Sequence, residues 1–279
     1  MEANMYKRVL LALDLEGVNN VIGEPNKGLY PDTEQWEIAR AQAVLEINAA
    51  AEALFDIGVE KVGLWDNHNG GNNVDRSLLD PRIIYIERVV GAPRMRFADG
   101  EYDCICYFGY HTMEGTLGGV LAHTMDSGSI QYYKLNGKYI GEVDMDAYIA
   151  AELGMPSRFF AGGDITCAQA KRAVGDIVTV VTKQELSRNQ AVFRDNDELM
   201  ADIRKNIAEA VQIDSAPRKL EFPAVMEKSY KRVEAAASYF NRLKNFGIEC
   251  AYPEDEILGH DAHTVVAKVN NIDEFIKSI

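Results

Sequence analysis

The segment "LALDLEGV", residues 11–18, places two carboxylates, Asp14 and Glu16, at the end of an apolar run with no basic residue beside them. Residues two apart in a strand project to the same face, so the pair would stand side by side if extended structure continues that far. Two ionised carboxylates held so close repel each other and resist removal from water. A cation between them would relieve both costs, whereas a strand that ends earlier would leave both acids solvated in a loop.

Other potential metal ligands occupy comparable positions. His68 follows the apolar run "VGLWDN", His111 follows "CICYFGY", Glu142 ends the predicted hairpin "IQYYKLNGKYIGEV", and His123 lies in "GGVLAHTM". A single histidine at a strand end is typical of a surface or hydrogen-bonded residue. Taken together, three carboxylates and two imidazoles are ligands that Zn²⁺ accepts, and five are too many for one tetrahedral ion. The set therefore predicts two ions that share a bridging carboxylate.

Alternating strand and helix patterns predict the elements that position these residues. Residues 8–15 form an apolar strand, residues 31–58 form a helix that Asp32 can cap and Gly58 ends, and residues 59–66 form a second strand. Strand, helix and strand in this order imply parallel strands joined by a right-handed crossover. The polar segments after both strands then fall on the carboxyl edge of the sheet, where open α/β sheets bind ligands.

The α/β pattern continues to about residue 215. It includes a strand at 102–111, the hairpin at 130–143 with an Asn136–Gly137 turn, helices at 144–154 and 165–174, and a strand at 176–188. Beyond it come a strand, a helix at 227–247, short strands and a terminal helix. We therefore predict an α/β fold with a mainly parallel sheet flanked by helices, divided into a metal-binding catalytic domain at 1–215 and a small α+β domain at 216–279.

Composition narrows the classes of partner. With 279 residues and 47% hydrophobic content the chain can fill a sizeable core, and its net charge of -14 argues against binding to nucleic acid or anionic lipid. No apolar run approaches the roughly 20 residues that a membrane span needs, and the short apolar run near the N-terminus lacks a cleavage site. We expect a cytoplasmic protein with reduced cysteines, of which Cys104 and Cys106 lie in a buried strand.

Seven segments, in order, resemble those of the DppA-type D-aminopeptidases, a zinc-dependent family. They are "LDLEG", "WDNH", "GYH", "GGVLAHTM", "GEVDMDAY", "AGGD" and "KQELSR". The resemblance spans roughly residues 8 to 190 and is weaker in the C-terminal part. It implies two Zn²⁺ ions in each chain and a ring-shaped homo-oligomer that encloses its active sites.

The resemblance also implies roles for individual residues. Asp14 would bridge the two ions. Glu16 and His68 would complete one coordination sphere, and His111 and Glu142 would complete the other.

The same resemblance makes His123 the catalytic base or nucleophile. Two zinc ions lower the pKa of a bound water and polarise a scissile carbonyl. A neutral, uncoordinated His123 would take the proton of this water and pass it to the leaving amine. The expected activity is removal of the N-terminal residue from short peptides or amides, and the expectation that this residue is a D-amino acid rests on the resemblance alone.

Two segments depart from the family pattern. The turn after His68 reads "DNHNGG" where the family more often has a serine-rich turn, and the segment between His111 and His123 is slightly longer. Both loops are expected to line the substrate cleft, so the departures bear on substrate choice more than on metal binding.

Other polar residues receive plainer predictions. Asp164 precedes a helix and is expected to cap it. Lys183 and Arg188 either meet a substrate carboxylate or have a structural or solvated role. His260 and His263 lie in the C-terminal part, away from the sheet edge, and are assigned no chemistry.

Two other functions remain open from the sequence. "LALDLEGV" loosely resembles the nucleophile motif of haloacid-dehalogenase-like, Mg²⁺-dependent phosphohydrolases, but Glu16 stands where these enzymes carry aspartate, and they have no use for histidines at strand ends. The second alternative is a non-catalytic protein that binds peptide or metal as an assembly unit. His123 weighs against it, because binding alone needs no uncoordinated base.

Overall fold

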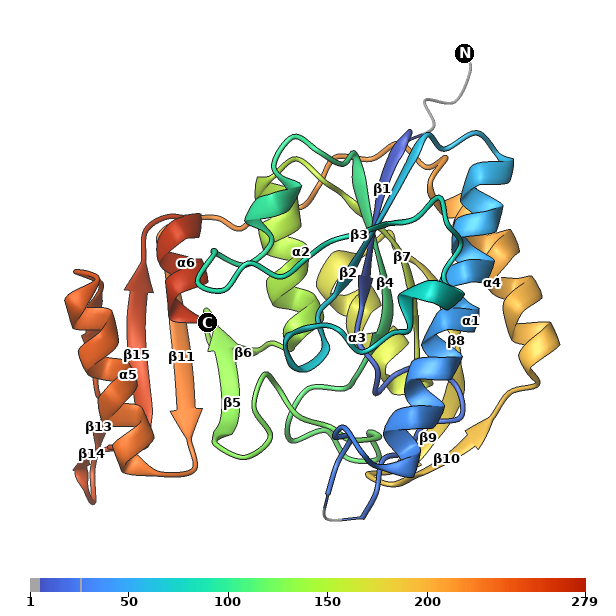
Figure 1. Cartoon of the computed structure of the whole chain (residues 1–279). Coiled ribbons are helices and arrows are strands. Elements are labelled where there is room, and N and C mark those ends of the chain that lie inside the picture. Colours follow the sequence, from blue (N-terminus) through green and yellow to red (C-terminus); the bar gives the residue numbers. More distant parts are fainter. Residues whose placement is uncertain (1–5, 26) are drawn as a thin grey trace.

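The computed structural model describes residues 6–25 and 27–279 and contains a six-stranded parallel sheet (Figure 1). In spatial order its strands are β3 (Ile84–Tyr85), β2 (Lys61–Asp66), β1 (Arg8–Leu13), β4 (Cys104–Tyr110), β7 (Ser157–Gly162) and β8 (Val178–Val181). The strand order reverses at β1, because β2 lies on one side of it and β4 on the other. The carboxyl ends of β1 and β4 therefore flank the position at which open α/β sheets bind their ligands.

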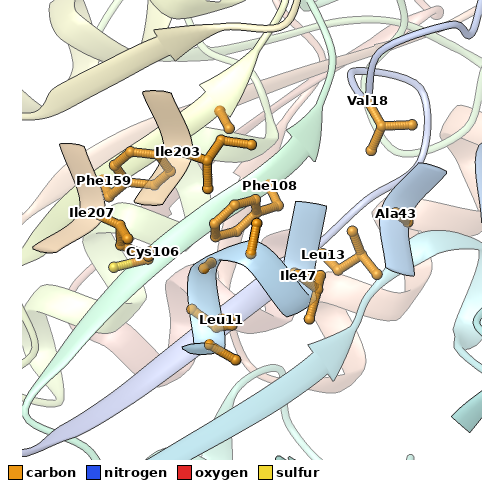
Figure 2. Close-up of a cluster of buried hydrophobic side chains, with 14 of the residues drawn as sticks. Leu11, Leu13, Val18, Ala43, Ile47, Cys106, Phe108, Phe159, Ile203 and Ile207 are labelled. Carbon is orange, nitrogen blue, oxygen red and sulfur yellow. The ribbon is translucent and has the colours of Figure 1, made fainter. Parts of the chain in front are cut away.

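Helices cover both faces of this sheet, which confirms the predicted fold class (Figure 1). Helices α1 (Glu34–Asp56) and α4 (Asn196–Ala210) pack together on one face, and α2 (Glu142–Glu152) and α3 (Asp164–Val174) cover the other. Successive residues of β1 alternate between the two faces. Figure 2 shows Leu11 and Leu13 of β1 packed with Phe108, Ile47 and Ile203 on the face of α1 and α4. Burial on both faces explains why the central strands read as continuous apolar runs.

A second, five-stranded antiparallel sheet lies beside the first one (Figure 1). Its strands, in spatial order, are β12 (Glu249–Ala251), β15 (Thr264–Val269), β11 (Ala224–Tyr230), β5 (Ile130–Leu135) and β6 (Lys138–Tyr139). Helices α5 (Val233–Asn245) and α6 (Ile272–Ser278) pack on its strands. Asn136 and Gly137 have φ angles of 50° and 76°, as a tight two-residue hairpin turn requires. The hairpin precedes residue 215 but pairs with β11, which follows that residue. The domain boundary at 215 stays a prediction.

The remaining elements are short. Strands β9 (Lys183–Ser187) and β10 (Gln190–Phe193) form one ribbon, and β13 (Glu254–Asp255) and β14 (Gly259–His260) form another. Three 3₁₀ turns, η1 (His68–Gly70), η2 (Arg76–Leu78) and η3 (Arg96–Ala98), lie in the connections. Within the described residues, the helices are all too short or too polar to span a membrane.

Several predicted boundaries were wrong. Helix α1 is capped by Thr33, whose side chain accepts a hydrogen bond from Trp36 N, and not by Asp32, which has a φ of 68°. The predicted helix at 227–247 begins only at Val233, because the preceding residues pair with β5 and β15 as strand β11. The predicted strand at 176–188 is divided between β8 in the parallel sheet and β9 in a separate ribbon. In each case a hydrogen-bonded partner that is distant in the sequence or a local cap decides the boundary.

Candidate metal centre

Two glycines allow the turn that follows β1 to meet the end of β4. Gly17 N donates a hydrogen bond to Gly109 O at 2.6 Å. A Cβ atom on Gly17 would lie 2.1 Å from Tyr110 O, and one on Gly109, which has a φ of 68°, would lie 2.0 Å from Asp14 O. No residue with a side chain fits at either position without moving the backbone. The close backbone contact brings the turn after β1 beside the loop after β4.

Three predicted ligands gather on one side of this contact. His68 Nδ1 lies 2.9 Å from Asp14 Oδ1 and 3.1 Å from Glu16 Oε2, and all three side chains are buried. Strand β1 ends at Leu13, so the two acids are not the extended pair that the sequence allowed. They are also not solvated, because the turn after Asp14 directs Glu16 back toward the same imidazole.

A second group gathers around the other oxygen of Asp14. His111 Nε2 lies 3.4 Å from Asp14 Oδ2 and 3.2 Å from Glu142 Oε1. Glu142 does not end the hairpin as predicted, because it is the first residue of α2 and follows the N-cap residue Gly141. The two oxygens of Asp14 therefore face two separate groups of ligand atoms, which is the arrangement of a bridging carboxylate.

His123 completes the cluster of predicted residues. Its ring stacks on that of His111, with the centroids 3.8 Å apart and the planes inclined by 8°. His123 Nδ1 lies 2.7 Å from Leu121 O, and because a carbonyl only accepts, the proton of the neutral ring sits on Nδ1. His123 Nε2 is therefore free to accept a proton. A ligand atom of His123 lies within 4.8 Å of one from Glu16 and one from His111, so the structure brings all six predicted residues together.

Burial and the neighbouring charges strongly shift the pKa values of the acids. Burial and the charge of Glu16 raise the pKa of Asp14 to about 7. Burial alone would also raise the pKa of Glu142, but the hydrogen bond and charge of His111 lower it to about 2. Among the described residues, only histidines form ion pairs with Asp14, Glu16 and Glu142. Three buried carboxylates without a lysine or arginine partner call for another source of positive charge.

The charges of the acids in turn change the pKa values of the imidazoles. Burial alone would lower the pKa of His68, but the charges and hydrogen bonds of Glu16 and Asp14 raise it to about 11. The pKa of His111 is raised to about 10, because Glu142 and Asp14 outweigh its burial. Sites that attract protons this strongly attract divalent cations as well, and a cation would compete with the protons for the same nitrogens. Carboxylate oxygens and imidazole nitrogens fit the preferences of Zn²⁺.

A sequence model of the peptidase M55 family, described as D-aminopeptidase, matches residues 7–247. The chain belongs to this family. Its fold is similar to that of the Zn-dependent D-aminopeptidase DppA from Bacillus subtilis, described as a self-compartmentalizing protease, with a TM-score of 0.82 at 20% identity over 97% of this chain and 94% of that one. A D-aminopeptidase of Bacillus subtilis (strain 168) is 24% identical over 185 residues. This second match covers 65% of each chain, so it spans less than two thirds of the relative's length.

The conformation of the turn after β2 requires a sequence rich in asparagine and glycine. Four consecutive residues, 69–72, have φ angles between 43° and 94°, a region that asparagine and glycine tolerate best. Asn73 closes the turn, because its side chain donates to His68 O at 2.7 Å and to Asp66 Oδ1 at 2.8 Å. The run "NGGN" thus supplies the residue types that this backbone conformation requires, and the turn holds His68 at the sheet edge.

Glu185 ties the loop of His123 to the sheet edge, and sequence reasoning missed it. Its carboxylate accepts hydrogen bonds from Val120 N at 2.8 Å and from Ile165 N at 3.1 Å. Glu185 thereby satisfies the first turn of α3, a task that we predicted for Asp164. Asp164 is instead the first residue of α3 and accepts a hydrogen bond from Glu185 N. The two residues are 21 positions apart, so no local sequence pattern marks this reciprocal pair.

The other predicted polar residues have separate positions. Lys183 is fully buried and donates to three carbonyls, including Glu16 O at 2.5 Å, so its role is structural. Arg188 donates to Ala122 O at 2.8 Å and lies near His123 at the edge of a cavity. His263 bonds Tyr230 O in the second sheet, away from the centre.

Proposed function

We propose that this protein is a dinuclear zinc aminopeptidase that removes an N-terminal D-amino acid from short peptides or amides. The observation that carries the proposal is the position of the Asp14 carboxylate, whose two oxygens face separate groups of ligand atoms. Asp14 would be shared by two ions, Glu16 and His68 would hold one, and His111 and Glu142 would hold the other. Membership of the M55 family supports the choice of D-residues.

The chain's own residues divide the work of such a reaction. When bound, a zinc pair supplies Lewis acidity for the scissile carbonyl and the attacking water, and an anchor for the free amino group. The three carboxylates would offset the charge of the ions and hold them in a buried position. Lys183 fixes the turn that carries Glu16, because its ammonium donates hydrogen bonds to carbonyl oxygens of that turn.

His123 is the proposed base. Burial and the neighbouring charge of His111 lower its pKa, so its ring is neutral at pH 7. Its Nδ1 proton is held by Leu121 O, and Nε2 is left to accept the proton of the attacking water and return it to the leaving amine. A neutral imidazole that can both accept and donate suits the two proton transfers of amide hydrolysis.

The same proposal extends to assembly. The solved protease of similar fold is described as self-compartmentalizing, and the match covers 97% of this chain. We expect a ring-shaped homo-oligomer that admits only short peptides to its active sites. Analytical ultracentrifugation of the zinc-loaded protein should give a mass several times the 31.0 kDa of one chain, and a monomer would contradict this part of the proposal.

Metal content and a substrate panel test the central claim. Zinc-reconstituted protein should hold two ions per chain and should release amine faster from D-alanine amide than from L-alanine amide. Asp14→Asn should reduce both zinc content and turnover, because the substitution removes the shared anion. Asp99→Asn, at an exposed acid outside the cluster, is the matched control. Full zinc content and turnover in Asp14→Asn would overturn the proposal.

A further inference from the structure

Two cavities meet at the metal centre. The first has a volume of about 380 Å³ and includes Asp14 and Glu142 in its wall. The second has a volume of about 230 Å³ and includes Glu16 and His123. Three residues line both cavities: His68, Asn69 and Met125. A peptide bound across the centre would therefore place one of its parts in each cavity.

The position of His123 gives the direction of the peptide, an argument that rests on the proposed function. Hydrolysis breaks the bond between the carbonyl carbon and the amide nitrogen, and the departing nitrogen must gain a proton. His123 carries that proton, so the leaving amine lies beside it in the second cavity. The N-terminal residue then lies over Asp14 and Glu142, with its side chain in the first cavity.

One part of the wall of the first cavity is apolar, while polar and charged residues such as Asp66, Glu87 and Arg88 line the rest. Trp65 and Phe97 meet edge to face with their centroids 5.5 Å apart, and Phe97 is 36% exposed. Three aliphatic or thioether side chains complete this surface: Ile86, Met95 and Met125. Arg94 also lines the cavity, but its guanidinium is paired with Asp146 at 2.5 Å and lies over the ring of Trp65.

We propose that the first cavity is the subsite for the side chain of the N-terminal residue, and that it selects D-residues with large apolar, above all aromatic, side chains. An aromatic ring would contact Trp65 and Phe97 in the edge or offset arrangements that such rings prefer. The methyl group of alanine would leave most of the cavity wall in water. Because the contact is apolar, the preference is set by the area of the side chain that leaves water.

Turnover of two matched dipeptides tests the proposal. The zinc-loaded protein should cleave D-Phe-Gly with a kcat/KM about ten- to a hundredfold above that for D-Ala-Gly. Ala92→Phe narrows the first cavity from an exposed position and should lower kcat/KM for D-Phe-Gly about tenfold more than for D-Ala-Gly. Ala201→Phe, on the exposed face of α4, is the control. Equal preference for the two dipeptides, or an equal loss in Ala92→Phe, would overturn the subsite.

A binding measurement gives a readout that does not depend on turnover. The chain has two tryptophans, so Trp36→Phe leaves Trp65 as the sole reporter inside the first cavity. Free D-phenylalanine should change the emission of Trp65 in a saturable way, and D-alanine should require at least tenfold higher concentration. No response to D-phenylalanine would overturn the subsite. Absence of cleavage of every peptide, with the Trp65 response intact, would refute the proposed function and leave the subsite standing.

Discussion

Asp14 connects the two halves of the candidate centre. Each of its oxygens faces a different imidazole, His68 on one side and His111 on the other. The side chain is buried beside a second acid, and its raised pKa reports the cost of ionising it there. The pair of divalent ions that we propose would offset this cost, whereas the cluster of acids is unfavourable without a source of positive charge.

His123→Ala provides the sharpest test at the scale of a single residue. We expect kcat to fall by about a hundred- to ten-thousandfold, because the variant loses the group that moves the proton. Zinc content should not change, since the five proposed ligands remain. His260→Ala, at an exposed residue of β14, should retain full activity. A His123→Ala enzyme with normal turnover would show that the proton moves by another route.

Residue types and strand-end positions pointed to Asp14, Glu16, His68 and His111, because the ends of neighbouring parallel strands share one edge. Glu142 was expected at the end of a hairpin and lies instead at the start of α2, and His123 owes its predicted role to the family resemblance. Their roles as ligands and base stay predictions. The structural partners of these residues could not be named in the same way. The sequence left Lys183 open between a contact to substrate and a structural or solvated role, and only the folded chain shows its ammonium among three carbonyls.

At the scale of elements, a buried polar network joins α1 to the turn after β1. Glu46 of α1 accepts hydrogen bonds from Asn19 N at 2.9 Å and from Gln42 Nε2 at 3.1 Å. Its other oxygen, Oε2, is buried and lacks a hydrogen-bond partner in the described part of the chain. Burial raises the pKa of Glu46 from 4.5 to about 7.

Glu46→Gln should therefore change how stability depends on pH. Below pH 4.5 the carboxyl is protonated in the folded and unfolded states, and it costs nothing. Between pH 4.5 and pH 7 the unfolded chain ionises this carboxyl while the folded chain keeps it protonated, so the native protein loses stability across this window and loses no more above it. The variant should gain roughly 2–3 kcal/mol relative to the native protein between pH 4.5 and pH 8.

Urea unfolding of chelator-treated protein at both pH values measures this difference. Glu34→Gln, at an exposed position in the first turn of the same helix, is the control. Its free energy of unfolding relative to the native protein should not rise between pH 4.5 and pH 8 as that of Glu46→Gln does. A Glu46→Gln difference that is the same at pH 4.5 and pH 8 would contradict the argument.

The parallel sheet was predictable, because strand and helix periodicities alternate along the first half of the chain. The second sheet was not, because the hairpin at 130–139 pairs with β11, almost a hundred residues later in the sequence. Local patterns give the type of an element, but they do not say which distant strand it will pair with. The same limitation explains the misplaced start of the helix at 227–247.

At the scale of the whole molecule, metal should stabilise the folded chain. The proposed ligands come from the ends of β1, β2 and β4 and from the start of α2, so they are assembled only when the chain is folded. A ligand that binds only the native state contributes about 2.7 kcal/mol at a hundredfold excess over its Kd. Removing zinc with a chelator should lower Tm by about 5 °C.

Differential scanning calorimetry with and without chelator measures this shift. The Asp14→Asn variant should respond much less, because it has already lost the shared ligand. A native protein with the same Tm in both conditions would show that metal does not bind preferentially to the folded state.

The contact between Gly17 and Gly109 has a consequence for which ions the centre accepts. The distance between the two halves is set there by main-chain atoms, and rotation of side chains cannot widen it. In the proposed two-ion centre, this fixed separation would accommodate ions of larger radius, such as Ca²⁺, less well than Zn²⁺. A methyl group added at either glycine would force apart the backbones of β4 and of the turn after β1, and we expect it to weaken this discrimination together with the packing of that sheet edge.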